Sequence, residues 1–137
     1  MLAPKFSKDD IVNQFESNYD LFGSAINELL EYENVYFRND NNIIYAKVRY
    51  EQDDQVIINK MSQEQLSKCK KTIKLIKKLN LENISKDEDN ITFLFHSSLK
   101  NSQYIIYVID EDKFFEKHDI SHYEKIKDKW FYLLEID

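Results

Sequence analysis

The spacing of the apolar residues changes along this chain from the period of a helix to the period of a strand, and no other feature restricts the possible folds as much. From Ser7 to about Leu30, apolar residues recur every three or four positions, at Ile11, Phe15, Tyr19, Phe22, Ile26 and Leu29. Ser7 is a typical N-cap, and the acidic Asp9 and Asp10 would follow in the first turn. We therefore expect a first helix here, interrupted at Gly23 by close packing or by a break.

Between Val35 and Lys60 the apolar residues alternate with polar ones, as they do in half-buried strands. Three such runs are separated by two turn-rich segments, Asn39–Asn42 and Glu51–Asp54. The pattern predicts a three-stranded meander, with strands at Val35–Phe37, Ile43–Tyr50 and Val56–Ile58.

A helical period returns after Lys60. Ser62 and Gln65 form a capping-box pattern, and an apolar stripe follows at Leu66, Cys69, Ile73 and Ile76. A second amphipathic helix should therefore run from Ser62 to about Leu79.

The rest of the chain contains three further apolar runs that resemble strands, Ile91–Phe95, Tyr104–Ile109 and Trp130–Leu134. The segment Lys113–Ile126 fits either a short helix or an ordered loop. We expect one α+β domain over residues 1–137, in which two main amphipathic helices pack on a single, mostly antiparallel sheet of about six strands.

Composition excludes several classes of protein. Hydrophobic residues make up 42% of the chain and aromatic residues 14%, so the chain has the apolar side chains that a folded core needs. A single glycine cannot build the glycine-rich loops that bind phosphates, and a single cysteine, Cys69, is expected to be a buried thiol. No apolar run is long enough to span a membrane, and the start Met1–Ser7 lacks the order of a signal peptide, so we expect a cytoplasmic protein without cofactors.

Two histidines provide the one candidate metal site. His118 and His122 are four positions apart, so on a helix they would lie on one side and could bind zinc, with Asp119 or Glu124 as a further ligand. That arrangement would make the chain a small metal-dependent hydrolase. The alternative is that both histidines are structural or solvent-exposed, and we expect no metal and no catalytic residues.

The net charge of −6 is unevenly distributed along the chain. Residues 1–59 contain five basic and eleven acidic residues, residues 60–86 eight and two, and residues 87–137 six and twelve. The basic middle segment includes a row of lysines in the second predicted helix, Lys68, Lys70, Lys71, Lys74, Lys77 and Lys78. These lysines could contact phosphates or could form a solvent-exposed helix face, but the acidic remainder of the chain disfavours nucleic acid and anionic membranes.

Three acidic clusters form the candidate partner-binding site. If the second helix leads from the third predicted strand to a parallel neighbour, and a hairpin follows, all three clusters lie at one edge of the sheet. Carboxylates so concentrated repel one another, and a cationic partner would relieve the repulsion. Local turn chemistry, which favours Asp, is the alternative explanation. The residues are Asp53 and Asp54, Asp87, Glu88 and Asp89, and Asp110, Glu111 and Asp112.

The C-terminal third resembles the ending of small bacterial immunity proteins of toxin–immunity systems, which pair a strand with a final strand of Trp and further aromatic residues. The resemblance is carried by Ser102–Asp110 and by Ile126–Tyr132, with its Trp130-Phe131-Tyr132 sequence. Phe131 and Leu133 stand where a fuller tyrosine run would be expected, and no toxin-contacting residue can be transferred.

The resemblance implies an inhibitor that neutralises a basic toxin, of which a nuclease is the preferred class, by occluding its active site. An acidic inhibitor would meet such a toxin by electrostatically steered association. A phage-type anti-defence protein or a nucleic-acid-binding protein is the main alternative to this interpretation.

Overall fold

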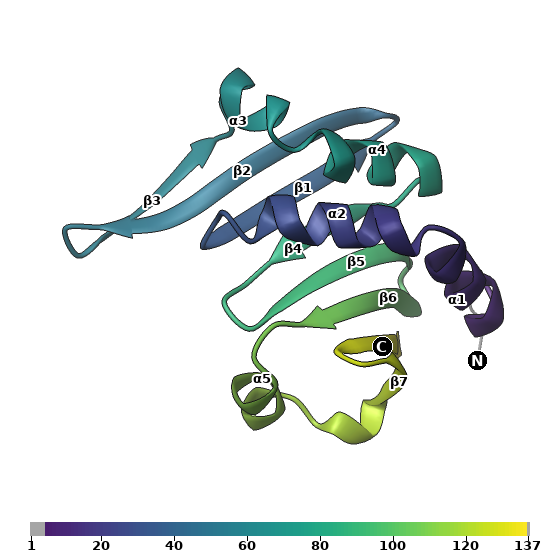
Figure 1. The fold of residues 1–137 in the computed structure, drawn as a ribbon. Coiled ribbons are helices and arrows are strands. Elements are labelled where there is room, and N and C mark those ends of the chain that lie inside the picture. Colours follow the sequence, from purple (N-terminus) through teal and green to yellow (C-terminus); the bar gives the residue numbers. More distant parts are fainter. Residues whose placement is uncertain (1–4, 137) are drawn as a thin grey trace.

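The computed structural model describes residues 5–136, which form one eight-stranded antiparallel sheet with helices on both of its faces (Figure 1). The order of strands across the sheet is β3-β2-β1-β4-β5-β6-β8-β7. Met1–Pro4, part of the segment on which the cytoplasmic expectation rests, lie outside the described residues. The strands are β1 (Asn34–Asp40), β2 (Ile43–Gln52), β3 (Gln55–Lys60), β4 (Asn83–Lys86), β5 (Asn90–Ser97), β6 (Asn101–Val108), β7 (Tyr123–Lys127) and β8 (Trp130–Ile136).

The α+β class and the antiparallel sheet are confirmed, but about six strands is too few. The strands β4 and β7 were not predicted, because neither has the apolar run that identifies a strand in a sequence. β4 contains one apolar residue, Ile84, which is fully buried, and β7 alternates weakly, with Tyr123 and Ile126 only partly buried. Both strands are specified by pairing with their neighbours, β1 and β5 for β4 and β8 for β7.

The prediction of two main helices is also inexact, since each is broken into two. The helices are α1 (Lys8–Ser17), α2 (Tyr19–Leu29), α3 (Gln63–Ser67), α4 (Lys70–Leu79) and α5 (Glu111–Lys117), followed by a short 3-10 turn, Ile120–His122. The first break is at Asn18, whose φ of −122° is not helical, and the second is at Cys69, with φ of −112°. Gly23 lies inside α2, so the break is not at this residue, and an added Cβ would meet no atom within 4 Å, so close packing does not explain the glycine either.

The main core lies between the sheet and the helices α1, α2 and α4. Alternate residues of the strands point toward these helices, and Trp130 of β8 is surrounded by the rings of Phe15, Phe22, Phe93 and Tyr107, with centroids 4.7–6.0 Å away. We call this face of the sheet the inner face.

A smaller apolar cluster covers part of the opposite, outer face. Here Phe114 of α5 packs on Ile106, Val108, Phe131 and Leu133 of β6 and β8. Only one half of the outer face is therefore buried, and the two halves of this face have different environments.

Candidate functional site

The three acidic clusters lie in turns at one end of the sheet, which we call the acidic end (Figure 1). Asp53–Asp54 connect β2 to β3, Asp87–Asp89 connect β4 to β5, and Asp110–Asp112 follow β6 and begin α5. The chain brings the clusters to this end by a topology other than the expected crossover from the third strand to a parallel neighbour. β3 is an edge strand that pairs with β2, and the chain returns through the unpredicted β4, so β5 runs parallel to β3 without being its neighbour.

Two of the three clusters are in direct contact. The Asp89 carbonyl accepts hydrogen bonds from the backbone N–H groups of Ile109 (2.8 Å) and Asp110 (3.2 Å), so the second and third clusters are joined. The first cluster stands apart. β1 begins at Asn34, opposite Arg49, so the β2–β3 hairpin continues past the end of β1 and carries Asp53–Asp54 at its tip (Figure 1).

Several of these carboxylates have local structural roles. Asp53 and Asp54 have φ of 51° and 62°, the left-handed conformation that a two-residue hairpin turn requires. The Asp110 side chain caps α5 by accepting a hydrogen bond from the Lys113 N–H (3.2 Å). The Asp89 side chain is only 1% exposed and accepts from the amide of Asn90 at 2.5 Å. Turn and cap chemistry therefore explains why Asp occurs at these positions. The carboxylates still carry their negative charges, so they still contribute to the acidic surface.

Cations neutralise only part of the acidic end. Lys117 Nζ lies 3.2 Å from Asp89 Oδ2, which raises the pKa of Lys117, and Glu88 lies within 3.4 Å of Lys113 and 3.9 Å of Lys117. Lys129 is nearby and donates to the carbonyl of Ile109 (3.4 Å). Within residues 5–136, no ion pair involves the other six carboxylates of the three clusters, Asp53, Asp54, Asp87, Asp110, Glu111 and Asp112.

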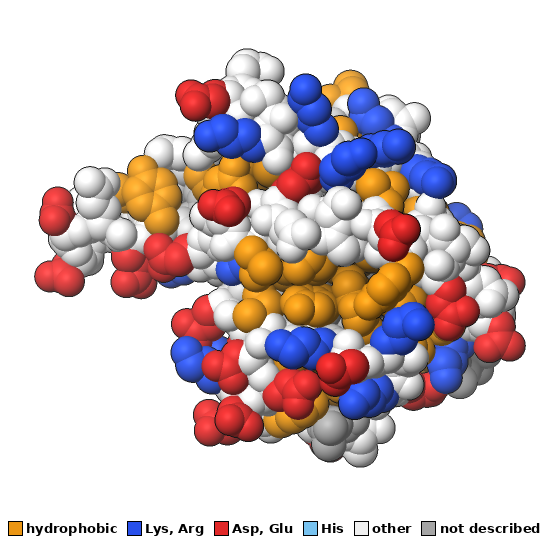
Figure 2. All heavy atoms as spheres, in the orientation of Figure 1, with side chains coloured by type: hydrophobic (Ala, Val, Ile, Leu, Met, Phe, Trp, Pro, Cys, Tyr) orange, Lys and Arg blue, Asp and Glu red, His pale blue; other side chains and the backbone are white. Residues whose placement is uncertain are grey.

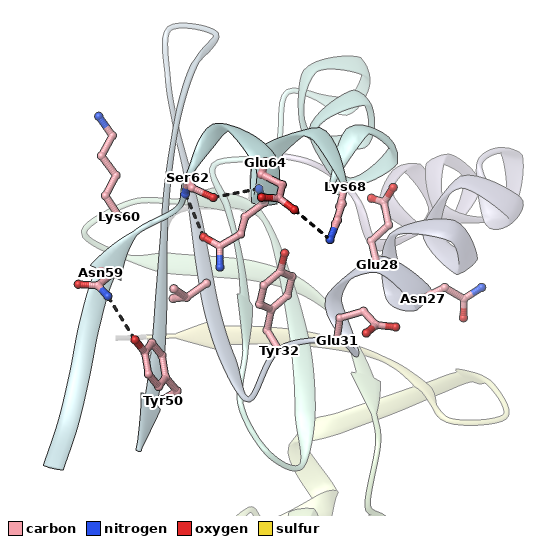
Figure 3. Close-up of a pocket in the computed structure, with 12 residues that line it drawn as sticks. Asn27, Glu28, Glu31, Tyr32, Tyr50, Asn59, Lys60, Ser62, Glu64 and Lys68 are labelled. Atoms are coloured by element: carbon pink, nitrogen blue, oxygen red, sulfur yellow. Dashed lines mark hydrogen bonds and ion pairs between the residues drawn. The ribbon is translucent and has the colours of Figure 1, made fainter. Parts of the chain in front are cut away.

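A groove of about 1050 Å³ lies between the C-terminal end of α2, the inner face of the β2–β3 hairpin and α3 (Figure 3). Its walls carry the partly buried rings of Tyr32 and Tyr50, and the Tyr50 hydroxyl accepts a hydrogen bond from the Asn59 amide (3.4 Å). The exposed carboxylate of Glu31 also lines the groove (Figure 3). No pattern in the sequence indicates this groove, because its walls come from segments that only the tertiary structure brings together.

One groove carboxylate is already occupied. Glu28 accepts hydrogen bonds from the backbone N–H groups of Lys71 (3.0 Å) and Thr72 (2.7 Å) and from the Thr72 hydroxyl (2.8 Å). Cys69, the N-cap residue of α4, makes no side-chain cap, so Glu28 supplies the missing acceptor from another helix. Glu28 thus fixes α4 to α2 and is not free for a ligand.

The two groups of the groove region that could act as nucleophiles are not activated. Burial, with the neighbouring Cys69, raises the pKa of Tyr32 to about 12, and burial raises the pKa of the Cys69 thiol. Both groups therefore stay protonated at neutral pH, with the Cys69 thiol directed at the Tyr32 hydroxyl at 4.0 Å. The groove offers hydrogen bonds and apolar ring surface to a ligand.

Part of the segment Lys113–Ile126 is a short helix, but His118 and His122 do not share it, so they are not aligned on one helix side. α5 ends at Lys117, His118 follows it, and His122 belongs to the 3-10 turn. His118 packs on Phe114 (4.4 Å between centroids) and its Nδ1 is hydrogen-bonded to the Tyr123 hydroxyl (3.1 Å). In the described part of the chain, no three His, Cys, Asp or Glu residues are placed to hold a metal ion together.

The row of lysines is exposed on α4 and at the end of α3 (Figure 2). Among the described residues, the only ion pair it makes is Lys68 with Glu64 at 3.8 Å. In the described part of the chain these lysines therefore form a solvent-exposed helix face.

Comparisons with protein-family models, with curated proteins and with solved structures each found no match to this chain. No helix within residues 5–136 has the length and apolar character needed to cross a membrane.

Proposed function

We propose that this chain is a non-catalytic inhibitor of the immunity-protein type, which binds a basic toxin of the nuclease class and occludes its active site. The observation that carries the proposal is the acidic end, where three acidic turns lie at one end of the sheet and six of their eight carboxylates make no ion pair within residues 5–136. A nuclease must be basic to hold nucleic acid, so its cleft is complementary to this surface.

The groove supports the same proposal. The C-terminal end of α2, with its partial negative charge, points toward the acidic end (Figure 1), and the groove is lined by three glutamates, Glu28, Glu31 and Glu64, against two lysines, Lys60 and Lys68. Tyrosine rings such as Tyr32 and Tyr50 are the side chains that most often anchor protein partners. A basic loop of the partner can therefore insert between the hairpin and α2 while the acidic turns contact the rim of its cleft.

The test uses a variant that loses charge without losing a structural role. Asp53→Asn and Asp54→Asn keep residues that tolerate the left-handed turn, and Glu111→Gln removes an exposed carboxylate of α5. The matched control, Glu16→Gln, Asp20→Asn and Glu135→Gln, removes the same charge from exposed positions elsewhere.

Wild type and both variants are immobilised and exposed to lysate of the native host, and bound proteins are identified by mass spectrometry. We expect a single basic protein with wild type and control, whose association with the Asp53, Asp54 and Glu111 variant is slower by about tenfold at low salt. Equal association rates for the two variants, or the absence of a basic protein, would contradict the proposal.

A further inference from the structure

The outer face of the sheet is uncovered over β1, β2 and β3. Its side chains here include Tyr36, which is 40% exposed, Tyr45 at 42% and Ile58 at 61%. The equivalent positions of β6 and β8 are buried beneath α5. Aromatic and β-branched side chains of this size normally bury their surface, so an exposed group of them marks an interaction site.

Cations alternate with the tyrosines on this surface. Tyr36 pairs across the strands with Lys47, and Arg38 pairs with Tyr45, so rings and cations form a chequered pattern. The Arg38 guanidinium lies 4.8 Å from the centre of the Tyr45 ring. Arg49, opposite Ile58, is the second and last arginine of the chain. We call this surface the tyrosine–arginine face; it consists of Tyr36, Arg38, Tyr45, Lys47, Arg49 and Ile58.

The three cations of the tyrosine–arginine face are free to meet an anion. No ion pair among residues 5–136 involves Arg38, Lys47 or Arg49. A shallow hollow of about 230 Å³ opens between Tyr36, Lys47, Arg49, Ile58 and Ser85. The surface therefore combines ring faces, positive charge and a concavity.

From this pattern we propose that the tyrosine–arginine face binds single-stranded nucleic acid. The rings of Tyr36 and Tyr45 stack on two bases, and Arg38, Lys47 and Arg49 contact the phosphates. Arginine planes also stack on bases, which a lysine cannot do.

The arrangement fits a single strand better than a duplex. Tyr36 and Tyr45 are diagonal neighbours in the β1–β2 register, a geometry that separates side chains by about 7–8 Å. Stacked bases in a duplex are about 3.4 Å apart, so two bases on these rings must be splayed. The face is the exposed surface of a sheet, and the hairpin that projects from it ends in Asp53–Asp54, whose carboxylates repel phosphates.

Acidic residues limit the extent of the site. Glu51 and Asp40 lie at opposite ends of the outer face of β2 and β1, so a strand of phosphates avoids both by crossing the β-strands instead of following them. The exposed lysines of α4 form a separate positive surface, but no exposed aromatic ring accompanies them in the described helix. Positive charge together with rings therefore distinguishes the tyrosine–arginine face from α4.

The experiment measures fluorescence anisotropy with labelled oligouridine and oligothymidine of about 12 nucleotides, and with a duplex of the same length. The variants are Tyr36→Ala, Tyr45→Ala and the triple change Arg38→Gln, Lys47→Gln, Arg49→Gln. The matched control removes the same charge from α4 by Lys70→Gln, Lys74→Gln and Lys78→Gln. Circular dichroism verifies that each exposed-site variant remains folded.

We expect a single strand to bind more tightly than the duplex, and each tyrosine change to weaken the binding of the single strand by at least about fivefold. The triple change of Arg38, Lys47 and Arg49 should make the binding affinity depend less steeply on salt concentration between about 50 and 200 mM. The α4 control should bind as wild type does. The proposal would be overturned if neither single strand bound, or if the duplex bound as tightly as the single strands. It would also be overturned if only the α4 control variant lost affinity. Displacement by poly-glutamate together with unchanged binding of the tyrosine variants would identify a docking site for acidic proteins and would overturn it as well.

Discussion

The outer face of the sheet has two halves that differ in what covers them. Over β6 and β8, α5 places Phe114 on the strands and the apolar side chains are buried. Over β1, β2 and β3, similar side chains such as Tyr36 and Ile58 stay exposed and alternate with cations. The covered half therefore contributes to the stability of the fold, whereas the uncovered half leaves its side chains accessible, because burial and not residue type sets the energetic role of a side chain.

The largest expected effect is in the covered half. Phe114→Ala should lower the free energy of unfolding by about 3–5 kcal/mol, because Phe114 is only 1% exposed and its loss leaves a cavity under α5. Urea denaturation measures the change, and Phe115→Ala, at a partly buried neighbour, should cost less. A loss below about 1 kcal/mol for Phe114→Ala would show that α5 does not cover the sheet tightly in solution.

A smaller effect is expected where α4 is attached above the uncovered half. Glu28→Ala removes the acceptor of the Lys71 and Thr72 N–H groups and should cost about 1.5–3 kcal/mol, because hydrogen bonds to charged groups cap the helix here. Glu31→Ala is the control, since Glu31 is exposed and makes no hydrogen bond or ion pair with residues 5–136. Similar losses for the two variants in thermal unfolding would contradict the proposed role of Glu28.

Alkaline pH compares the inner-face groove beside α4 with the outer-face cluster beside α5, through one tyrosine in each. Burial raises the pKa of Tyr32, beside α4, to about 12 and raises the pKa of Tyr123, beside α5. A folded-state pKa above the unfolded value of about 10 stabilises the fold below pH 10, and this contribution is lost as the pH rises through the folded-state pKa. Between pH 10 and 12 the stability of wild type should therefore fall more steeply than that of Tyr32→Phe or Tyr123→Phe.

Burial lowers the pKa of Lys86, so the titration of Lys86 makes stability rise with pH in this range, opposite to the effect of the tyrosines. Lys86 is present in wild type, Tyr32→Phe and Tyr123→Phe, so its contribution is the same in all three. Unfolding in urea at several alkaline pH values gives the slopes. Identical slopes for wild type and Tyr32→Phe would contradict the assignment of Tyr32.

The smallest effect is expected on the uncovered half. Tyr36→Ala and Tyr45→Ala should each change the free energy of unfolding by less than about 1 kcal/mol, because exposed cross-strand and cation–π contacts contribute little. The same urea assay measures these changes beside Phe114→Ala. Losses as large as that of Phe114→Ala would mean that this half is also covered in solution, and the distinction between the halves would fail.

Much of the fold could be predicted from the sequence where the period of apolar residues is strong. The alternation in Ile43–Tyr50 and the capping box at Ser62 each correspond to an observed element, and the Ser62 cap is formed as expected, with Gln65 returning its side chain to the Ser62 N–H at 2.9 Å. β4 could not be predicted, because four residues with one apolar side chain become a strand only when β1 and β5 supply hydrogen bonds on both sides.

Candidate sites were less predictable, because a site depends on which segments meet. The acidic turns were predicted from local runs of Asp and Glu, and the structure places them at one end of the sheet, although the chain reaches that end by a different route. The groove beside Tyr32 and Tyr50 had no signal in the sequence, since its walls are far apart along the chain.

Local sequence patterns were enough to predict the class of the fold, the positions of most helices and strands, and the acidic character of the turns, because period, capping and turn chemistry act between residues close together in the chain. The tertiary structure was needed to bury Asp89 and to place it against Lys117. It also decided that both arginines share one uncovered face with Tyr36 and Tyr45. The register of antiparallel strands sets these relations, and register depends on pairing between segments that no local pattern connects.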